Sequence, residues 1–564
     1  EDAGGSLGPA AQVDQGVVRH RVSLRRPLVS LALSDVVSDP ELPPAAPSSL
    51  LRTSSLVALG TALSRGTGFL RLFATGYAIS YAALTDTYTL ANNTPNIVYE
   101  LVVGGVLSAT LVPVFVHHTE EDDDAGTSAV ITVATAALIA LVVTGIFAAP
   151  ALMRLYTMTA DGQVADQQRH VATALLRLFM PQMLFYGLTA MGTAVLNARR
   201  KFLAAAFAPV LNNLIVVGVL LALPHVAGHT PTLNDVGHDN GLLVLLGLGT
   251  TAGIVAMTLV LLPAVIRSGF RFRFNFAPRN PAVKEVARMS GWTLGYVIAN
   301  QIALFIVLLL ANRRVSGVAT YTTAYIVFLL PHALVTVSLV TTLAPQLASS
   351  ARRQATQAYR DTFALGVRLM ALIVLPAATG YIVLGQPIIH ALLFHGAVKP
   401  AEAHLIGSNL AMFGTGLFGF SLYLYTLNGF YARRDTRTPF FLNVGENVLN
   451  IGLALILQPH FGVPGLALSF ALAYNISAVV ALATLRRRVG RLDSTRSLQA
   501  VARIAVACAV MAATVAVVSR VVGDSALVQT AAGVLVGGAV YLGMLLLLRV
   551  EDVATLRSRL LRRA

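Results

Sequence analysis

From about residue 51 to its end, the chain alternates between long apolar stretches and short charged segments. The apolar stretches run to about 20 residues or more, the length a helix needs to cross the hydrocarbon core of a bilayer. Fourteen of them can be distinguished, and each predicts one membrane-spanning helix. Their approximate bounds are 53–80, 88–116, 127–153, 171–197, 203–223, 241–266, 287–311, 318–348, 362–385, 403–430, 438–458, 463–485, 500–522 and 526–548. The pattern therefore predicts an all-α polytopic membrane protein.

Composition agrees with this fold class and excludes a soluble enzyme. Hydrophobic residues make up 55% of the 564 positions, and charged residues make up 12%. Soluble domains carry about 25% charged residues, so this chain cannot cover a water-facing surface of its size. The sequence contains no nucleophile elbow, no phosphate-binding glycine loop and no set of histidines or cysteines at metal-ligand spacing. Its one cysteine, Cys508, excludes a disulfide framework. We expect neither an enzyme nor a metal protein.

The net charge of +15 is distributed in a way that predicts orientation. With the N-terminus placed inside, the inside segments hold 31 lysines and arginines and the outside loops hold six. Such a bias is the positive-inside rule, and it places both termini in the cytoplasm. It also accounts for the basic charge without nucleic acid as a partner. The basic inside segments are 19–52, 199–201, 267–288, 352–360, 433–437, 486–503 and 549–563.

Short matches at a nearly constant offset indicate an internal repeat. Ala198-Arg199-Arg200 matches Ala432-Arg433-Arg434 at an offset of 234, and two further matches lie at 233 and 232. These are Thr87-Tyr88-Thr89 with Thr320-Tyr321-Thr322, and Thr110-Leu111 with Thr342-Leu343. Two homologous halves of six spans each share one orientation, which gives a pseudo-two-fold axis along the membrane normal. Two such lobes around a central cavity are typical of a transporter.

The repeat predicts the division of the chain. Residues 1–50 are rich in proline and glycine without an apolar run, which predicts a disordered cytoplasmic tail with no signal peptide. Residues 51–285 form the expected N-lobe and residues 286–490 the expected C-lobe. Residues 491–564 hold two additional spans and a basic cytoplasmic end.

Two arginines in the first span are candidates for anion binding. Arg65 lies 13 residues past Arg52, about 20 Å along a helix, which places it near the bilayer centre. Arg71 lies about 120° further round, and the glycines between them would allow a bend that turns both toward one cavity. An ionisable residue at this depth needs a reason. One is a buried ion pair with Glu100; the other is a phosphate or pyrophosphate site, which the forked guanidinium suits.

A second polar cluster lies in the eleventh span. Asn443 and Asn447 are four residues apart, and Glu446 lies beside them, so one helix presents a ridge of oxygen and amide groups. The ridge could be a hydrogen-bonded seam between helices. The alternative is a coupling site for a cation such as Na⁺ or for a proton.

Several stretches resemble the MurJ (MviN) family of lipid II flippases, within the multidrug/oligosaccharidyl-lipid/polysaccharide exporter superfamily. The resemblance covers about residues 51–490 and is closest to the actinobacterial type. FYARRDTRTP (430–439) is its most specific motif. The others are LSRGTGFLR (63–71), TDTYTLANNTPNIVYE (85–100), PQMLFYGLTAMGTAVLNARRKFLAAAFAPVLNN (181–213) and QPIIHALLFHG (386–396).

The resemblance implies a fold of fourteen helices in two lobes and a set of substrate-binding residues. The two essential arginines of the family's first helix correspond to Arg65 and Arg71. Its aspartate early in the second helix corresponds to Asp86. The third cavity arginine, which follows Pro95-Asn96, falls on Tyr99, and a fourth falls on Ile326. The substrate-binding residues that the resemblance implies are therefore Arg65, Arg71, Asp86, Asn96 and Tyr99. Two of the four family arginines are therefore replaced in this chain.

The function implied is translocation of the undecaprenyl-pyrophosphate-linked peptidoglycan precursor across the bacterial cytoplasmic membrane by alternating access. The expected partners are this lipid-linked precursor, membrane lipids and other cell-wall synthesis proteins. No cofactor is expected beyond a coupling cation or the membrane potential. Three alternatives stay open: a flippase for another polyprenyl-linked glycan, an ion-coupled multidrug exporter of the same superfamily, and a non-transporting scaffold for wall synthesis.

Overall fold

A computed structural model describes residues 47–100, 111, 114–116, 124–160, 162–289, 291–490 and 494–550. The chain divides into two compact units, Glu1–Ser55 and Leu56–Ala564, and the description below concerns the second. Throughout the described residues the secondary structure is helical, without a strand, as the hydrophobic pattern predicts. The expected tail lies outside the described residues, apart from its last four.

The first half of the chain forms a group of helices that pack on one another. Within it, α9 packs against α5, α6 and α7, and α2 packs against α5 and α6. Polar caps begin the two helices that follow the loop after α7: Thr232 and Asp235 make a capping box on α8, and the Asp239 carboxylate accepts from the first amides of α9. The helices are α1 (Pro47–Ile79), α2 (Ala83–Tyr99), α4 (Asp124–Tyr156), α5 (Gly162–Phe179), α6 (Gln182–Ala198), α7 (Leu203–Ala227), α8 (Leu233–His238) and α9 (Asn240–Ile266).

The second half forms another group, in which α18 packs against α15, α16 and α17. Its helix after Pro331 continues through one π-helical turn, η2 (His332–Thr336). The helices are α11 (Gly291–Ala311), α12 (Gly317–Pro331), α13 (Val337–Arg352), α14 (Thr356–Leu393), α15 (Pro400–Gly414), α16 (Leu417–Ala432), α17 (Arg437–Phe461) and α18 (Val463–Val489). The short helix α10 (Pro281–Met289) precedes them and packs mainly against α4 of the first group.

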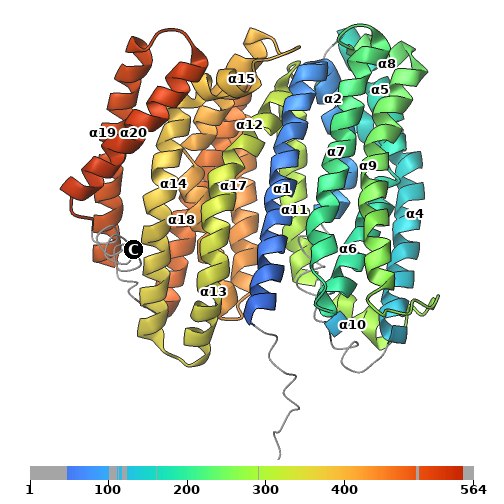
Figure 1. The fold of residues 1–564 in the computed structure, drawn as a ribbon, viewed down its shortest axis with the longest axis horizontal. Helices are drawn as coiled ribbons and strands as arrows, with labels where there is room; N and C mark the ends of the chain where they lie inside the picture. Colours follow the sequence, from blue (N-terminus) through green and yellow to red (C-terminus); the bar gives the residue numbers. More distant parts are fainter. Residues whose placement is uncertain are drawn as a thin grey trace, which may run out of the picture. The chain divides into compact units, whose positions relative to one another are not determined.

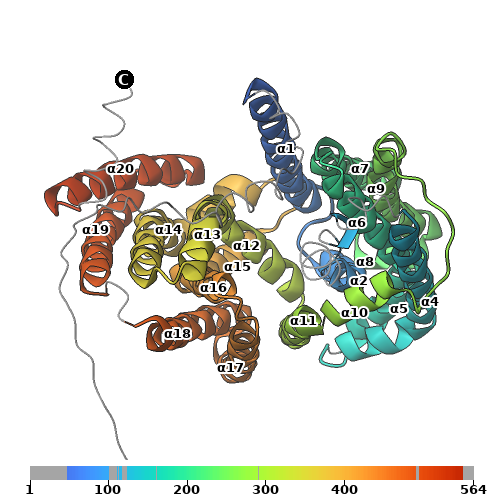
Figure 2. The same ribbon diagram turned by 90° about the horizontal axis from the view of Figure 1, so that it is seen from below.

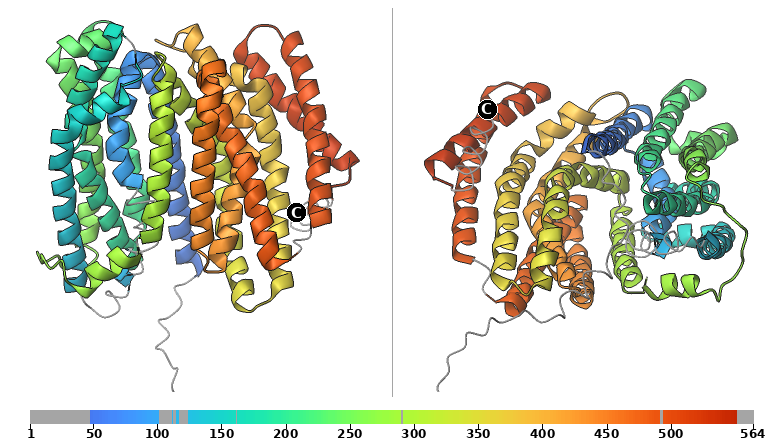
Figure 3. Two further views of the ribbon diagram at one scale, coloured as in Figure 1. Left: turned by 180° about the vertical axis from the view of Figure 1, so that it is seen from behind. Right: turned by 60° about the horizontal axis from the view of Figure 1, so that its bottom comes forward.

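Two further helices, α19 (Ser494–Val521) and α20 (Ala526–Leu547), pack on each other and on α14. A small separate core of buried residues, including Cys508, Met511 and Tyr541, joins them to Leu384 of α14. Figure 1 shows α19 and α20 at the edge of the second group, and Figure 3 shows the same arrangement from behind. Seen along the helices in Figure 2, α4–α9 lie together on one side and α12–α18 on the other, with α11 between them.

The positions where helices begin and end agree with the sequence repeat. Helices α7 and α17 start 234 residues apart and also end 234 residues apart. The turn before each contains a double arginine, and its second member has a positive φ in both, 56° at Arg200 and 60° at Arg434. A left-handed conformation is uncommon for a side chain of this size, so its recurrence at equivalent positions is strong evidence of a structural repeat.

The predicted count of fourteen spans is not confirmed. Eleven described helices are long and apolar enough to cross a membrane, or twelve if α15 and α16 form one span. These two meet at a 50° bend around Gly414 and Gly416, where the expected span 403–430 was continuous. A side chain at Gly416 would collide with Ala471, so glycine permits this close approach. The other two expected spans are 53–80, which is helical but carries many polar residues, and 88–116, which lies partly outside the described residues.

Candidate functional site

Arg71 faces hydroxyl groups of the neighbouring helices in the first half. Its Nη2 donates to the Tyr88 hydroxyl of α2 at 3.0 Å, and the Tyr88 hydroxyl lies 3.3 Å from Oγ1 of Thr250 on α9. Tyr88 and Thr250 are buried, whereas Arg71 is half-buried. The guanidinium therefore has one neutral hydroxyl as a hydrogen-bond partner and keeps donors for a further anion, since it carries five N–H groups.

Asn96 belongs to the same neighbourhood. The Tyr186 hydroxyl of α6 donates to Asn96 Oδ1 at 3.0 Å, and this tyrosine also lies close enough to the Arg71 guanidinium to interact with it electrostatically. The structure thus brings Arg71 and Asn96, two of the predicted site residues, to one region between α1, α2 and α6. The side chain of Tyr99 lies outside the described residues.

Arg65 is exposed, six residues before Arg71 on the same continuous helix. The helix around it is held to α7 by Asn213, whose Nδ2 donates to Ser64 O at 3.1 Å and to Thr67 Oγ1 at 3.2 Å. Among the described residues, no ion pair joins Arg65 or Arg71 to Glu100. The structure gives no support to the predicted alternative of a buried ion pair with that carboxylate.

Asp86 is bonded to the other half of the chain. Its carboxylate accepts from the backbone amides of Ser316 at 2.6 Å and Ala319 at 2.7 Å, at the start of α12. A carboxylate at a helix N-terminus satisfies amides that have no partner in the helix and interacts favourably with the helix dipole. The sequence repeat puts Ala319 at the position equivalent to Asp86. Alanine has no carboxylate, so the first half caps a helix of the second half but Ala319 makes no corresponding cap on the first half.

A pair of contacts related by the repeat joins the halves near this cap. Buried Glu402, at the start of α15, accepts from the Ser80 hydroxyl and from the Tyr81 amide at 3.2 Å. Gln168 of α5 exchanges hydrogen bonds with Asn312, at 3.0 and 3.2 Å. Because Ser80 corresponds to Asn312 and Glu402 to Gln168 at offsets of 232 and 234, the same contact occurs twice, once with a carboxylate and once with an amide.

Asn443 and Asn447 form a seam with a third asparagine. Both donate from Nδ2 to Asn300 Oδ1 on α11, at 2.9 and 2.8 Å, and Asn447 also donates to the Asn443 carbonyl at 2.9 Å. The hydrogen-bonded seam that the sequence offered as one reading of this ridge is therefore present. Asn300 was missed, although an asparagine followed by a glutamine inside an apolar span is itself a signal of such a contact.

Glu446 lies on the same helix but outside the seam. Its side chain is 1% exposed, and in the described part of the chain neither carboxylate oxygen has a hydrogen-bond partner. The same is true of Asn443 Oδ1 and the Tyr423 hydroxyl. Rings of Tyr296, Tyr423 and Tyr474 pack in the adjoining cluster between α11, α16 and α18. An acidic group is thus enclosed among aromatic rings, with the Tyr474 hydroxyl close to it, in a setting that suits a bound proton or cation.

The motif FYARRDTRTP forms the turn between α16 and α17. Asp435 Oδ1 accepts from the Thr438 amide at 3.0 Å, and its other oxygen pairs with Arg488 at the end of α18. Partial burial opposes the charge of Asp435, but these contacts outweigh it and hold the pKa of this carboxyl below its usual range. The most specific motif of the resemblance therefore shapes a turn and joins two helix ends.

An apolar groove of about 240 Å³ lies beside the Arg71 region. Its walls come from α1, α7 and the end of α14, so residues of both halves line it. Leu70, the neighbour of Arg71, is in the α1 wall and is 46% exposed. The apolar walls of this groove suit a hydrocarbon chain that enters it from the bilayer.

Comparison with known proteins gives one consistent result. The family model described as "Lipid II flippase MurJ" matches residues 76–536, most of the chain. The protein named "Probable lipid II flippase MurJ" from Rhizobium meliloti (strain 1021) is 28% identical over 474 residues, which are 82% of this chain and 86% of that relative.

Solved structures show the same fold. One described as "Lipid II flippase MurJ, inward closed conformation" has a TM-score of 0.71 at 19% identity and covers 87% of this chain and 97% of that chain. A multidrug resistance MATE family transporter of the MOP superfamily, in an inward-facing conformation, has a TM-score of 0.62 at 14% identity and covers 76% of this chain and 96% of that chain.

Proposed function

Because the chain belongs to the MurJ family of lipid II flippases, we propose that it moves undecaprenyl-pyrophosphate-linked peptidoglycan precursor between the leaflets of the bacterial cytoplasmic membrane. The observation that carries this proposal is the Arg71 guanidinium, half-buried between α1 and α2, whose hydrogen-bond partner among the described residues is the neutral Tyr88 hydroxyl. A guanidinium binds a pyrophosphate through parallel, charge-assisted hydrogen bonds.

In this mechanism the site binds and releases the lipid-linked precursor without forming a covalent bond to it. Arg71 and Arg65 hold the pyrophosphate, Asn96 lies beside them, and the Tyr88 hydroxyl orients the Arg71 fork. The polyprenyl chain stays in the hydrocarbon, where the apolar groove beside Leu70 offers it a surface. The halves rock about the site, and the contacts of Asp86, Glu402 and Gln168 join them on one side of it.

Ion coupling belongs in the other half. An uncompensated carboxylate inside the membrane is costly, so Glu446 favours a proton or a cation as its companion. Asn443 and Asn447 offer further oxygen ligands beside it. Binding there would favour one arrangement of α11 and α17, and an ion gradient or the membrane potential would return the transporter to its starting conformation.

We place both termini on the cytoplasmic side, and the charge bias of the loops supports this orientation. On a background without Cys508, single cysteines at 199–201, 267–288 or 433–437 should resist an impermeant thiol reagent in intact cells. Cysteines at 224–240 or 386–402 should react. Labelling of the 433–437 loop from outside would contradict this topology.

The exporter alternative draws support from the likeness to a MATE transporter fold. Exporters of this kind usually take cations, and the positive charges of Arg65 and Arg71 oppose a cationic substrate. A flippase for another polyprenyl-linked glycan would use the same pyrophosphate site. A scaffold would need neither the arginines nor the buried glutamate.

A leaflet-accessibility assay for lipid II in cells depleted of this protein separates these functions. We expect lipid II to become inaccessible at the outer surface on depletion and accessible again when the wild-type chain is supplied. The Arg65→Ala/Arg71→Ala chain, present at equal abundance, should fail to restore it. Restoration by that double variant would support the scaffold, and unchanged accessibility on depletion would point to another substrate.

A further inference from the structure

The segment between α9 and α10 runs extended along the side of α4. Over residues 270–276, here called the strap, every second backbone amide donates to a side-chain oxygen of α4. The acceptors are four residues apart, about 6 Å along a helix, and two extended residues span about 6.6 Å, so the two repeats match. The contacts are Arg271 N–Asp124 Oδ2 at 3.0 Å, Arg273 N–Ser128 Oγ at 3.2 Å and Asn275 N–Thr132 Oγ1 at 3.3 Å.

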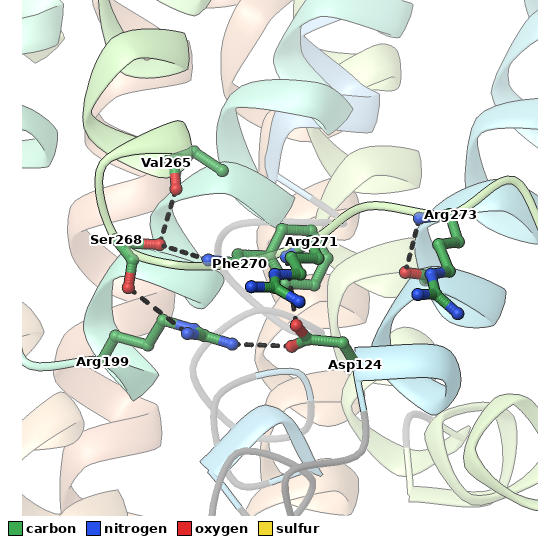
Figure 4. A network of polar contacts seen from close by, with 8 residues as sticks. Asp124, Arg199, Val265, Ser268, Phe270, Arg271 and Arg273 are labelled. Atoms are coloured by element: carbon green, nitrogen blue, oxygen red, sulfur yellow. Dashed lines mark hydrogen bonds and ion pairs between the residues drawn. The ribbon is translucent and has the colours of Figure 1, made fainter.

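The beginning of the strap is fixed by Arg199 at the end of α6. Its guanidinium pairs with Asp124 Oδ1 at 2.6 Å, donates to Ser268 O at 3.3 Å and lies 5.7 Å from the centre of the Phe270 ring. Asp124 thus uses one oxygen for Arg199 and the other for the strap amide (Figure 4). The backbone of the strap is therefore held along one edge without using the side chains of Arg271 or Arg273.

An extended segment held by its edge presents alternate side chains on opposite faces. Phe272, Phe274 and Phe276 occupy one face and are 53%, 80% and 59% exposed. Arg271 and Arg273 alternate with them along the chain and are also exposed. The strap thus carries three rings on one face and two guanidinia on the other, at an end of the helices where further basic residues follow or precede helix ends, including Arg200, Arg267 and Arg279.

We propose that the strap binds the anionic phospholipids of the adjacent leaflet, with its rings among the upper acyl chains and its guanidinia on the phosphate groups. Aromatic rings favour the boundary between hydrocarbon and headgroups, and basic side chains at that depth attract anionic lipids. The positive-inside bias makes this the cytoplasmic leaflet.

The test uses tryptophan fluorescence in the full-length chain reconstituted into phosphatidylcholine nanodiscs. Trp292, the single tryptophan, is changed to phenylalanine, and Phe274→Trp places a reporter on the strap. Brominated phosphatidylglycerol should quench this reporter about twofold more strongly than the same fraction of brominated phosphatidylcholine. Equal quenching by the two lipids, or quenching by neither, would overturn the proposal.

Variants separate the strap from general charge. Arg271→Gln/Arg273→Gln should abolish the preference for phosphatidylglycerol, whereas Arg486→Gln/Arg487→Gln, which removes two exposed charges from the end of α18, should keep it. Ser128→Ala/Thr132→Ala retains every charge but removes two anchors, and it should weaken the preference. Equal loss in the α18 control would show a net-charge effect, and a full preference without the anchors would show that the fixed geometry is unnecessary. Either result would contradict the proposal, and thermal unfolding of each variant verifies that it is folded.

Discussion

The contact between α1 and α7 in the first half corresponds to the contact between α11 and α17 in the second, yet the two have opposite chemistry. Aligning the ends of α1 and α11, Ile79 with Ala311, puts Arg65 and Arg71 opposite Val297 and Ala303. At the offset of α7 and α17, Glu446 corresponds to Asn212. One half carries cationic side chains on its first helix, and the other carries an enclosed acid on the partner helix.

What the two contacts share is the asparagine that joins the helices. Asn213 bonds α7 to α1, and its equivalent Asn447 bonds α17 to α11 through Asn300. The repeat thus preserves the helix pairing while each half acquired its own charge. Opposite charges in separate halves suit a transporter that binds an anion in one half and a cation in the other, because the two sites then need not compete.

The largest effect is expected when the arginines of the first half are replaced. Arg71→Ala should fail to support growth of a depleted strain although the protein still inserts, and Arg65→Ala should do the same. A charge-assisted hydrogen bond contributes about 1.5–3 kcal/mol, so losing it lowers substrate affinity about ten-fold to over a hundred-fold. Arg71→Lys should restore growth only in part, since it keeps the charge without the fork.

The matched control for Arg71 is Tyr88→Phe, which keeps the guanidinium and removes its hydroxyl partner. We expect this variant to support growth with reduced transport in the lipid II accessibility assay. Normal growth of a strain with Arg71→Ala at wild-type abundance would contradict the role of Arg71 in binding an anionic substrate. Recovery of an Arg65→Ala defect by Glu100→Gln would instead favour an ion pair in another conformation.

Removing the acidic side should separate coupling from binding. Glu446→Gln keeps the shape of the side chain and loses its charge, so transport should become independent of the ion gradient while substrate binding stays intact. Transport into vesicles with and without an imposed gradient measures this, with Glu285→Gln on α10 as the control. Full transport with unchanged ion dependence in Glu446→Gln would show that Glu446 is not a coupling site and that this region only joins helices.

A variant of Asp86 can show whether this residue binds substrate or only joins the two halves of the chain. Asp86→Asn keeps one acceptor but loses the charge that faces two amides of α12, so we expect a loss of about 1–3 kcal/mol in stability, with lower transport. Thermal unfolding and substrate binding are measured on the same preparation. A lower binding affinity at an unchanged unfolding temperature would instead make Asp86 a substrate contact, as the family resemblance implies.

The sequence predicted the features that depend on one helix at a time. Apolar length located the spans, and the double arginines revealed the repeat. Depth in the membrane singled out Arg65 and Arg71, and the ridge of polar residues on one helix singled out Glu446. The partners Tyr88, Thr250 and Asn300 were not predicted, because a hydroxyl or amide inside an apolar run does not indicate which helix it faces.

The same reason explains the two largest surprises. Asp86 caps α12, more than 200 residues away, and the chain pattern contains no sign of that contact. The segment 403–430 reads as one apolar stretch, but its glycines allow a bend that depends on close packing against Ala471. Both features are set by contacts between helices, which hydrophobic periodicity does not encode.

The smallest expected effect gives the sharpest comparison of the two seams. Asn213→Ala removes two hydrogen bonds to α1, whereas Asn447→Ala removes one to Asn300 of α11 and one to the Asn443 carbonyl of its own helix. Single hydrogen bonds between membrane helices contribute on average about 0.6 kcal/mol, so each variant should lose about 1 kcal/mol of stability. If both asparagines only join helices, the unfolding temperature should fall in both variants, and more in Asn213→Ala, which loses two bonds between helices rather than one.

A cation site beside Glu446 predicts a difference between them. A ligand that binds only the folded state raises stability with its concentration, so the coupling cation should raise the unfolding temperature of the wild-type chain over that in choline. Asn213→Ala should keep this increase, because its seam lies in the half without the acid. Asn447→Ala should lose most of it, since it removes an oxygen ligand and one of the two donors that hold Asn300. An equal increase in both variants, with Na⁺ and with protons alike, would leave the two seams chemically equivalent, and coupling would have to be sought elsewhere in the chain.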